Sequence, residues 1–588
     1  MNYCDNIYFP TRRSTRVVTV GNLKIGGDHP IRLQSMLTSD TMNTEACVQE
    51  ALRLVSAGCE LVRITAPTVK DAANLQHIHA ALRAAGCSVP LVADIHFKPE
   101  AALEAAKWVE KIRINPGNFA DSKKFTVREY SDVEYETELE RIRERFTPLV
   151  RLCKARSVAM RIGTNHGSLS DRIMNRFGDS PYGMVESALE FARIARDLNY
   201  HEFIFSMKAS NPKIMIAAYR LLVARLTQEG TDWNYPIHLG VTEAGDGEDG
   251  RIKSAIGIGS LLADGIGDTI RVSLTEDSEH EIPVARALAK KWICDNGESN
   301  RPAIQDHPTI QPAWEFFDYQ RRISEKLFFE NIALGENELI RVVVPYKVHE
   351  AVAHKLEKMG DYQPELIYEN LPLREVDPRS DREIAVLNEE KTPCLISVRD
   401  HCDMEPIGAF RLLTARVKRP HAILLKDTLQ PALDATEKFA ENLLASATII
   451  GSLLCDGIGD AILIRREPAA GASLRLAYTI LQAAGVRIFK TDYVACPSCG
   501  RTLFNLQETT ARIKAVTGHL KGVRLAIMGC IVNGPGEMAD ADFGYVGGAP
   551  GKVNLYVGKK AVRFNIPEAE AVEQLVALIR EHGRWVEP

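Results

Sequence analysis

The sequence predicts an α/β protein that begins with a (β/α)8 TIM barrel, continues with a degenerate barrel-like α/β domain and ends with a small α+β domain. Three observations support this. β-branched runs alternate with helical stretches up to about residue 295, a ten-residue segment of that region recurs near residue 451, and a compact cysteine-bearing unit begins near residue 486. The 588 residues are too many for one hydrophobic core. We therefore expect domains at 1–295, 300–480 and 486–588.

The first domain contains eight strand-like runs, most of them followed by a plausible helix. The helical stretches include 45–57, 69–85 and 184–198, and the strand-like runs lie at 31–35, 60–65, 90–95, 111–115, 158–163, 203–208, 236–241 and 269–274. Such an alternation over roughly 250 residues is typical of a single β/α barrel.

The second domain repeats part of the first. It follows a polar, proline-containing stretch at 300–312 that we interpret as a linker, and its strand-like runs lie at 339–345, 365–368, 394–398 and 421–426. The segment 451–460 matches 259–268 with one substitution, which indicates a copy of barrel sequence. The copy has lost particular polar residues of the barrel, and a structural role is expected for it: Lys253, Arg271 and Ser273 correspond to Ala445, Leu463 and Arg465.

The C-terminal unit has the pattern of an α+β domain. Strands are predicted at 486–493 and 523–528, a hairpin at 552–557 and 561–565, and helices at 504–516 and 567–580. A cysteine pair and a glycine-rich loop lie between these elements.

Composition excludes some classes of partner. Hydrophobic residues make up 45% and charged residues 25% of the chain, and the formal net charge is 72 − 77 = −5. These values are typical of globular proteins and give no sign of a nucleic-acid or membrane surface. No apolar run approaches the roughly 18–20 residues of a membrane span, and the N-terminal stretch lacks the apolar core of a secretory signal. We expect a cytoplasmic protein.

Three of the twelve cysteines form one organised group. Cys496 and Cys499 have Cys-x-x-Cys spacing, and Cys530 follows in a glycine-rich segment. Three thiolates could hold an iron–sulfur cluster, which would leave a fourth position for Glu537 or a substrate. A zinc ribbon would need a second pair, and a redox dithiol would leave Cys530 unexplained, but the residues alone keep both alternatives open. A radical enzyme that uses S-adenosylmethionine would need three cysteines in one loop, which this sequence lacks.

Cationic residues stand at the ends of several predicted barrel strands: Arg63, Arg113, Arg161, Lys208 and Arg271. A charged side chain is expensive to bury in a barrel unless it is paired or binds a ligand. The carboxyl ends of barrel strands meet at one mouth, and guanidinium groups suit phosphate. The five cations together predict an anionic substrate, in particular a diphosphate.

Other polar residues follow the same strands. They are Asp94 and His96, Asn115, Asn165 and His166, and His238 with Glu243. Asp94 and His96 are two residues apart and should share a strand face. Glu243 is a candidate proton donor or charge stabiliser. Any one of these groups could instead be a satisfied polar group of the core.

These segments closely resemble one family, the 4-hydroxy-3-methylbut-2-enyl diphosphate synthases. The resemblance covers the barrel and the C-terminal domain, and the chain looks like the longer, three-domain form of the family. The matching segments are Pro30-Ile-Arg-Leu-Gln-Ser-Met, Val92-Ala-Asp-Ile-His-Phe, Arg113-Ile-Asn-Pro-Gly-Asn, Arg161-Ile-Gly-Thr-Asn-His-Gly-Ser, His238-Leu-Gly-Val-Thr-Glu-Ala-Gly, Gly265-Ile-Gly-Asp-Thr-Ile-Arg-Val-Ser, the Cys-x-x-Cys and Gly529-Cys-Ile-Val-Asn-Gly-Pro-Gly-Glu.

The resemblance implies a 4Fe–4S cluster on Cys496, Cys499 and Cys530, with Glu537 as an exchangeable fourth ligand. It implies two-electron reductive ring opening of 2-C-methylerythritol 2,4-cyclodiphosphate, with electrons from an external ferredoxin or flavodoxin. Asp94, His96 and Glu243 would line the reacting end, with Glu243 as the proton donor. The diphosphate site would include Arg63, Arg113, Asn115, Arg161, Asn165, Lys208, Arg271 and Ser273.

A homodimer is expected, because in the short form of the family the partner subunit supplies the cluster domain. Whether the inserted domain lets the site close within one chain is left open by the sequence.

Overall fold

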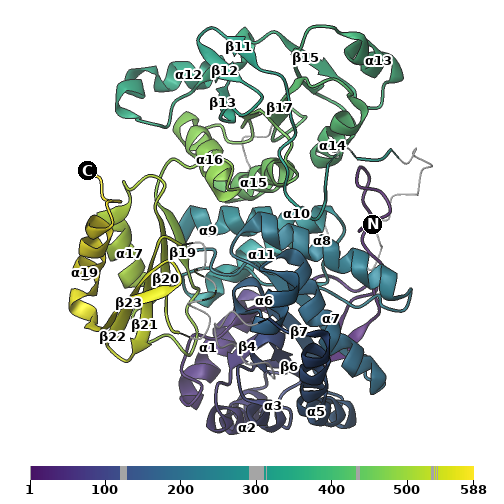
Figure 1. Cartoon of the computed structure of the whole chain (residues 1–588), viewed down its shortest axis with the longest axis vertical. Helices are drawn as coiled ribbons and strands as arrows, with labels where there is room; N and C mark the ends of the chain where they lie inside the picture. The colour runs from purple at the N-terminus through teal and green to yellow at the C-terminus, as the bar shows by residue number, and fades with distance from the viewer. Residues whose placement is uncertain are drawn as a thin grey trace.

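The structure is a computed structural model that describes residues 2–119, 129–290, 310–312, 314–431, 438–531, 536, 538 and 541–588. These residues form a barrel, a second curled sheet and a C-terminal domain (Figure 1). The second sheet stacks on the barrel, and the C-terminal domain lies beside the junction of the two, next to helices α9 (Gly247–Ser254) and α16 (Ala470–Ala483).

The predicted TIM barrel is confirmed. Eight parallel strands pair in the order β8-β7-β6-β5-β4-β3-β10-β9, and a bridge between Phe205 and Ile237 links the last strand to the first. The strands are β3 (Arg32–Met36), β4 (Leu61–Thr65), β5 (Leu91–Asp94), β6 (Lys111–Ile114), β7 (Ala159–Asn165), β8 (Phe203–Lys208), β9 (His238–Leu239) and β10 (Thr269–Ile270).

Helices surround the barrel. Thr68 begins α2 with a capping box to Asp71, and Gly58 ends α1 in the left-handed conformation at φ 99°. Besides α9, the helices are α1 (Thr44–Ala57), α2 (Val69–Ala84), α3 (Pro99–Ala105), α4 (Pro116–Phe119), α5 (Asp132–Arg156), α6 (Asp171–Phe177), α7 (Pro181–Asp197), α8 (Pro212–Glu229), α10 (Ser260–Ala263) and α11 (Glu281–Ala289).

A hairpin of β1 (Val18–Val20) and β2 (Leu23–Ile25) covers one end of the barrel. Val18, Val20 and Ile25 are fully buried in one cluster with the barrel residues Leu61 and Val92. Leu61 is the first residue of β4, and Val92 is the second residue of β5, which begins at Leu91. The hairpin therefore covers the amino end of the barrel strands. The carboxyl end is left for the C-terminal domain.

The second domain is a copy of the barrel, as the sequence predicts. In the first barrel Asp268 accepts a hydrogen bond from the backbone N–H of Ile237 at 2.8 Å, and in the second Asp460 accepts one from Ile423 at 2.9 Å. A hairpin also precedes each barrel. The strands are β11 (Leu327–Phe329), β12 (Ile332–Leu334), β13 (Arg341–Val344), β14 (Leu366–Ile367), β15 (Leu373–Val376), β16 (Leu395–Val398), β17 (Ala422–Lys426) and β18 (Ala461–Leu463).

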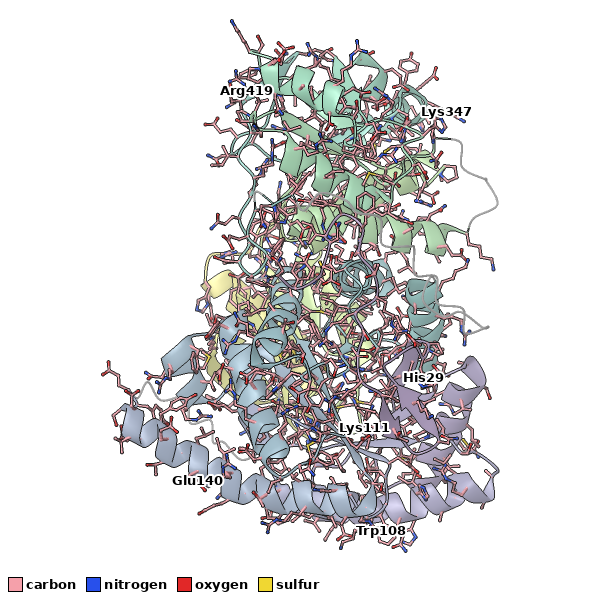
Figure 2. The ribbon with its side chains drawn as sticks, turned by 90° about the vertical axis from the view of Figure 1, so that its right-hand side faces the viewer. His29, Trp108, Lys111, Glu140, Lys347 and Arg419 are labelled. Atoms are coloured by element: carbon pink, nitrogen blue, oxygen red, sulfur yellow. The ribbon has the colours of Figure 1, made fainter. Side chains whose placement is uncertain are left out.

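The copy is smaller than the original. Its parallel sheet has six strands in the order β14-β13-β18-β17-β16-β15. The chain passes from β14 to β15 through a short turn at Tyr368–Asn370, so the counterparts of β5 and β6 are missing. Its helices are α12 (Tyr346–Val352), α13 (Asp381–Glu389), α14 (Pro406–Arg416), α15 (Phe439–Cys455) and α16. Figure 2 shows Lys347 and Arg419 at the end of this domain that lies farthest from Lys111 of the first barrel.

Cations at the mouth of the copy are neutralised by the chain itself. Lys426 Nζ lies 2.9 Å from Asp400 Oδ1 and also bonds Glu375. Both terminal nitrogens of Arg465 bond Asp400, at 2.8 and 2.7 Å. No excess of positive charge is therefore left among these four residues to attract an anion.

The two barrels meet through equivalent segments of the repeat. These are the π-helical turn Ala255–Gly259 with α10 on one side and α15 on the other. The Oγ atoms of Ser260 and Ser452, which are equivalent positions, are 2.6 Å apart. A Cβ at Gly259 or at Gly451 would lie 2.3 Å from a side-chain atom of the opposite segment, so glycine permits the close approach. The contact is approximately twofold symmetric.

A buried cluster of four charges lies at the same contact. Arg220 bonds Asp264 at 2.8 Å and Asp456 at 2.6 Å, and Arg411 bonds Asp456 at 2.8 Å and Asp264 at 2.7 Å. All four side chains are at most 2% exposed. Each arginine thus bridges one carboxylate of its own barrel and one of the other.

The C-terminal domain is a five-stranded mixed sheet, confirming the predicted α+β class. Strands β19, β20 and β21 are parallel, and β22 and β23 complete the sheet in antiparallel pairings. Its elements are β19 (Asp492–Ala495), α17 (Leu506–Thr517), β20 (Arg524–Met528), β21 (Phe543–Ala549), β22 (Lys552–Val557), β23 (Lys560–Pro567) and α19 (Glu568–Glu581).

Some predicted elements differ from those observed. The strand predicted at 486–493 begins only at Asp492, because Phe489 packs against Tyr362 and Tyr478 of the second barrel, with ring centroids 4.8 and 5.4 Å away. Strand β21 was not predicted, since glycines interrupt its alternation. Strands β9 and β10 have two ladder residues each and are shorter than predicted. The predicted linker 300–312 lies almost wholly outside the described residues. No helix in the described chain has the length and apolarity to cross a membrane.

Candidate active site between the barrel and the cysteine domain

The carboxyl end of the first barrel and the C-terminal domain enclose one cavity within a single chain. The residues that line it come from all eight barrel strands or the segments that follow them, from the two cysteine loops and from the end of β20. The barrel contributes Met36, Arg63, Asp94, Arg113, Arg161, Asn165, Lys208, Thr242, Glu243, Arg271 and Ser273, and the C-terminal domain contributes Cys496, Pro497, Ser498, Cys499, Arg501, Met528, Gly529 and Cys530.

The five cations predicted from the sequence all line this cavity. Each is at most 7% exposed. Two of them are held by carboxylates: Arg113 Nη1 lies 3.0 Å from Asp94 Oδ1, and Arg271 makes two bonds to Glu281, at 2.9 and 3.2 Å. Glu281 lies on α11, and the sequence did not single it out.

Within the described parts of the chain, the other three cations have no carboxylate partner at so short a distance. Arg63 Nε lies 3.9 Å from Asp94 Oδ2. Arg161 Nε and Nη1 are buried without a hydrogen-bond partner in the described structure. Burial, together with the neighbouring cations, lowers the pKa of Arg63 to about 9 and holds the pKa values of Arg161 and Lys208 well below their ordinary range. The cavity is therefore short of negative charge and suits a polyanionic ligand.

Replacing Arg161 by methionine tests this surplus of positive charge. We expect the free energy of unfolding of the ligand-free variant to rise by about 1 kcal/mol, with a higher Tm, because an uncompensated buried charge is removed. Binding of inorganic pyrophosphate, measured by calorimetry, should weaken about 10- to 100-fold, since hydrogen bonds to charged groups contribute about 1.5–3 kcal/mol. Arg143→Met, on the exposed face of α5, is the control and should change neither quantity. A lower Tm with unchanged pyrophosphate affinity would contradict the interpretation.

Asp94 and His96 form a pair at the end of β5. His96 Nε2 lies 3.2 Å from Asp94 Oδ2. Burial would raise the pKa of Asp94, but Arg63 and Arg113 hold it well below its usual range. Burial, and then the charge of Arg501, lower the pKa of His96 to about 3. The pair is therefore a carboxylate beside a neutral imidazole whose Nε2–H faces that carboxylate.

Glu243 lies at the opposite side of the mouth. It is 4% exposed, and its backbone is in the left-handed conformation at φ 49°, which is uncommon for a residue with a side chain. Its Oε2 is buried without a hydrogen-bond partner among the described residues, and burial raises the pKa of the carboxyl group. The next residue, Ala244, makes a bridge to Ala495, directly before Cys496.

Four residues singled out in the sequence do not line the cavity. Asn115 Nδ2 donates to Ser168 Oγ at 2.7 Å. His166 Nε2 lies 2.9 Å from Asp179 Oδ1, and the buried His238 lies 3.5 Å from Thr269 Oγ1. His96 lies behind Asp94. These side chains can position the lining residues but do not reach the cavity.

The three cysteines face the cavity from two loops that follow β19 and β20. The backbone N–H of Gly529 donates to Cys496 Sγ at 3.1 Å. Burial raises the pKa of the Cys496 thiol well above its ordinary value. Among the described residues no three His, Cys, Asp or Glu side chains are placed to hold a single metal ion. Glu537 lies outside the described residues.

These cysteines fit a sulfur-ligated group. All three line the same cavity, a backbone N–H donates to one sulfur, and the cation Arg501 lines the cavity with them. Hydrogen bonds and positive charge at the sulfurs are what an iron–sulfur group requires of its surroundings.

Two glycines let the domains approach. A Cβ on Gly500 would lie 2.7 Å from the carbonyl oxygen of Ser39 and 2.9 Å from Thr65 Oγ1. A Cβ on Gly536 would lie 1.5 Å from the carbonyl oxygen of Gly167. Only glycine permits these backbone contacts between the cysteine loops and the barrel mouth.

Two basic residues were not identified from the sequence: one lies inside the barrel at the amino end of β6, outside the cavity lining, and the other lines the cavity. Lys111 is fully buried, its Nζ lies 3.4 Å from Gln34 Oε1, and Figure 2 shows it within the ribbon of the first barrel. Arg501 lines the cavity from the cysteine domain. A charged residue directly after Cys499-Gly500 was the available signal for Arg501. The role of Arg501 could not be inferred from this signal, because Arg501 meets the barrel residues only when the two domains close.

Comparison with known proteins gives matches over both domains of the site. The family model of the GcpE TIM-barrel domain matches residues 15–286, and that of the GcpE protein C-terminal domain matches residues 492–581.

Similar proteins extend over the whole chain. A 4-hydroxy-3-methylbut-2-en-1-yl diphosphate synthase (flavodoxin) of Akkermansia muciniphila is 60% identical and covers 100% of this chain and 99% of its own. The protein of the same name from Leptospira interrogans is 47% identical over 98% of each chain. The chloroplastic 4-hydroxy-3-methylbut-2-en-1-yl diphosphate synthase (ferredoxin) of Arabidopsis thaliana is 42% identical and covers 100% of this chain and 89% of its own.

Proposed function

Since the chain belongs to the GcpE family of 4-hydroxy-3-methylbut-2-enyl diphosphate synthases, we propose that it reduces 2-C-methyl-D-erythritol 2,4-cyclodiphosphate to 4-hydroxy-3-methylbut-2-enyl diphosphate. The observation that carries this proposal is a single cavity in which buried cations face three cysteines. A cyclic diphosphate would supply the negative charge that balances these cations. The cysteines supply the ligands for a redox group.

Cys496, Cys499 and Cys530 would hold a 4Fe–4S cluster, with Glu537 as the exchangeable fourth ligand. When bound, this cluster would supply electrons one at a time and an iron site that can accept an oxygen ligand. In the overall reaction two electrons and one proton enter, the ring C–O bond breaks toward the diphosphate, and a hydroxyl group leaves as water. The electrons would come from an external ferredoxin or flavodoxin.

The residues of the barrel would bind, orient and protonate the substrate. Arg63, Arg113, Arg161, Lys208 and Arg271 would hold the diphosphate, with Asn165 and Ser273 beside them. Asp94, kept ionised and fixed by His96, would orient the reacting carbon skeleton. Glu243 would deliver the proton from its carboxyl group, whose raised pKa keeps more of it protonated. Asn115 would act indirectly by holding Ser168.

The second barrel is proposed to be a scaffold. The cations at its mouth are neutralised by its own carboxylates, and its sheet lacks two strands of the active barrel. The cavity is closed within one chain, so the expected homodimer is not required to complete the site. Dimerisation itself stays a prediction.

The first test is the iron, acid-labile sulfide and zinc content of anaerobically purified protein, followed by an assay with the cyclic diphosphate. We expect about four irons and four sulfides per chain, as in one cubane cluster, and substrate-dependent oxidation of a reduced donor. One zinc and no sulfide in protein made with ample iron would refute the redox proposal. A full cluster without turnover of the cyclic diphosphate would refute the substrate.

Domain closure can be tested through Gly500. Gly500→Ala places a Cβ 2.7 Å from the Ser39 carbonyl oxygen, and such overpacking costs about 1–3 kcal/mol. If the cost falls on the closed state, kcat should decrease about 10- to 100-fold, with iron content unchanged. Gly471→Ala, where a Cβ meets nothing within 4 Å, is the matched control. A normal kcat for Gly500→Ala would show that this contact does not limit closure.

A further inference from the structure

Arg501 is a half-buried cation with two enclosed donor atoms that are unused in the described structure. It follows Cys499 and Gly500 directly and lines the cavity that the barrel and the cysteine domain share. Its Nε and Nη1 atoms are buried and have no hydrogen-bond partner in the described parts of the chain. The side chain lines the cavity together with Cys499 and Cys530. A guanidinium group with free N–H donors in an enclosed site requires a partner.

The charges around Arg501 show which partner it faces. The ionisable groups that act most strongly on its charge are Cys499, Asp94 and Cys530, and the first and third of them line the cavity beside it. Two of these three neighbours are cysteines of the proposed cluster site. The cation is thus surrounded chiefly by sulfur rather than by the carboxylates that pair with Arg113 and Arg271.

A purely structural ion pair with the barrel does not explain this placement. Asp94 is already bonded by Arg113 at 3.0 Å and by His96 at 3.2 Å, with Arg63 at 3.9 Å. Other ion pairs hold the C-terminal domain against the first barrel, such as Lys490 with Asp249 at 2.8 Å. Arg501 is therefore not needed to balance Asp94 or to hold the domains together.

We propose that Arg501 is a positioning residue that donates to the Cys499 sulfur and directs its remaining N–H groups at the sulfur-ligated group, and that it stabilises the reduced form of that group. This inference rests on the proposed function. Adding one electron makes the ligated group more negative, and a nearby cation lowers the free energy of that state. Hydrogen bonds to the sulfurs act in the same direction.

Arg501 meets residues of the barrel only across the contact between the two domains. Arg501 belongs to the cysteine domain, yet the Asp94 and Glu243 regions that meet it belong to the barrel. Closure excludes water from around Arg501 and strengthens its interaction with the sulfurs. The closed site is thus the one in which reduction is most favourable.

The test is an anaerobic redox titration, followed by electron paramagnetic resonance, of the full-length protein and two variants. Iron and sulfide are counted first, so that a protein without a cluster exposes failure of the proposed function itself. With equal cluster content, Arg501→Gln should have a more negative midpoint potential than the natural protein. Arg501→Lys, which keeps the charge but loses the fork of donors, should be shifted in the same direction by less.

Lys514→Gln is the matched control. It removes a cation of the same domain that pairs with Asp246 away from the cysteines, and its midpoint potential should equal that of the natural protein. Unchanged potentials in both Arg501 variants with full clusters would overturn the inference. Loss of the cluster in Arg501→Gln leaves Arg501→Lys to decide the question. If neither variant retains a cluster, a structural role is established and the proposal fails.

Discussion

Replacing Glu243 by glutamine should lower kcat by about 10²- to 10⁴-fold, the usual contribution of a positioned general acid. Glutamine keeps the shape of the side chain but cannot deliver a proton. Glu243 is buried in the cavity, its Oε2 has no partner among the described residues, and burial raises its pKa. Steady-state kinetics with a saturating reduced donor would measure the effect.

Diphosphate affinity distinguishes this role from a general disturbance of the site. Inorganic pyrophosphate should bind Glu243→Gln at least as tightly as the natural protein, because a group that can carry negative charge has been removed from beside Lys208 and Arg271. Glu248→Gln, at an exposed pair with Arg475, is the control and should have normal kcat. A Glu243→Gln enzyme with normal kcat and KM would show that the proton comes from another group.

The positions of the barrel cations could be predicted from the sequence because they depend on one simple rule. Parallel strands end at the same edge, so cations at the ends of successive strands meet at one mouth. Their partners could not be predicted in the same way. Glu281, which holds Arg271, lies on a helix and has the sequence context of any surface glutamate.

The repeat was visible in the sequence, but its geometry was not. Nine identical residues in a ten-residue segment identified the copy. The two missing strands lie in a region where the two halves share no such matching segment. Arg501 shows the same limit at the site. Its neighbour Asp94 is distant in the sequence and meets it only when the two domains close.

The four-charge cluster between the barrels predicts the largest effect on stability. Arg411→Leu leaves Asp264 and Asp456, both fully buried, with Arg220 as their remaining arginine partner. Removal of one partner from a buried ion pair destabilises by about 3–5 kcal/mol, because the charge left behind keeps its desolvation penalty. Calorimetry should show a clear decrease in Tm for the transition that includes the second barrel.

Two further variants make the prediction specific to buried charge. Arg475→Leu breaks an exposed pair with Glu248 between the same two barrels, and should cost at most about 1 kcal/mol. Adding Asp264→Asn to Arg411→Leu removes the unbalanced carboxylate, so the double variant should regain part of the lost stability. Equal Tm values for Arg411→Leu and the natural protein would contradict the account.

The same substitution should loosen the cysteine domain. This domain contacts both barrels, through Lys490 with Asp249 of the first and Lys521 with Asp361 of the second, at 2.8 and 2.7 Å. If the second barrel is a scaffold, a weakened contact between the barrels removes one of the two supports of the closed site. Arg411→Leu should therefore lower kcat at temperatures well below its Tm, although Arg411 lies on α14, outside the cavity lining. A normal kcat there would show that the first barrel alone positions the cysteines.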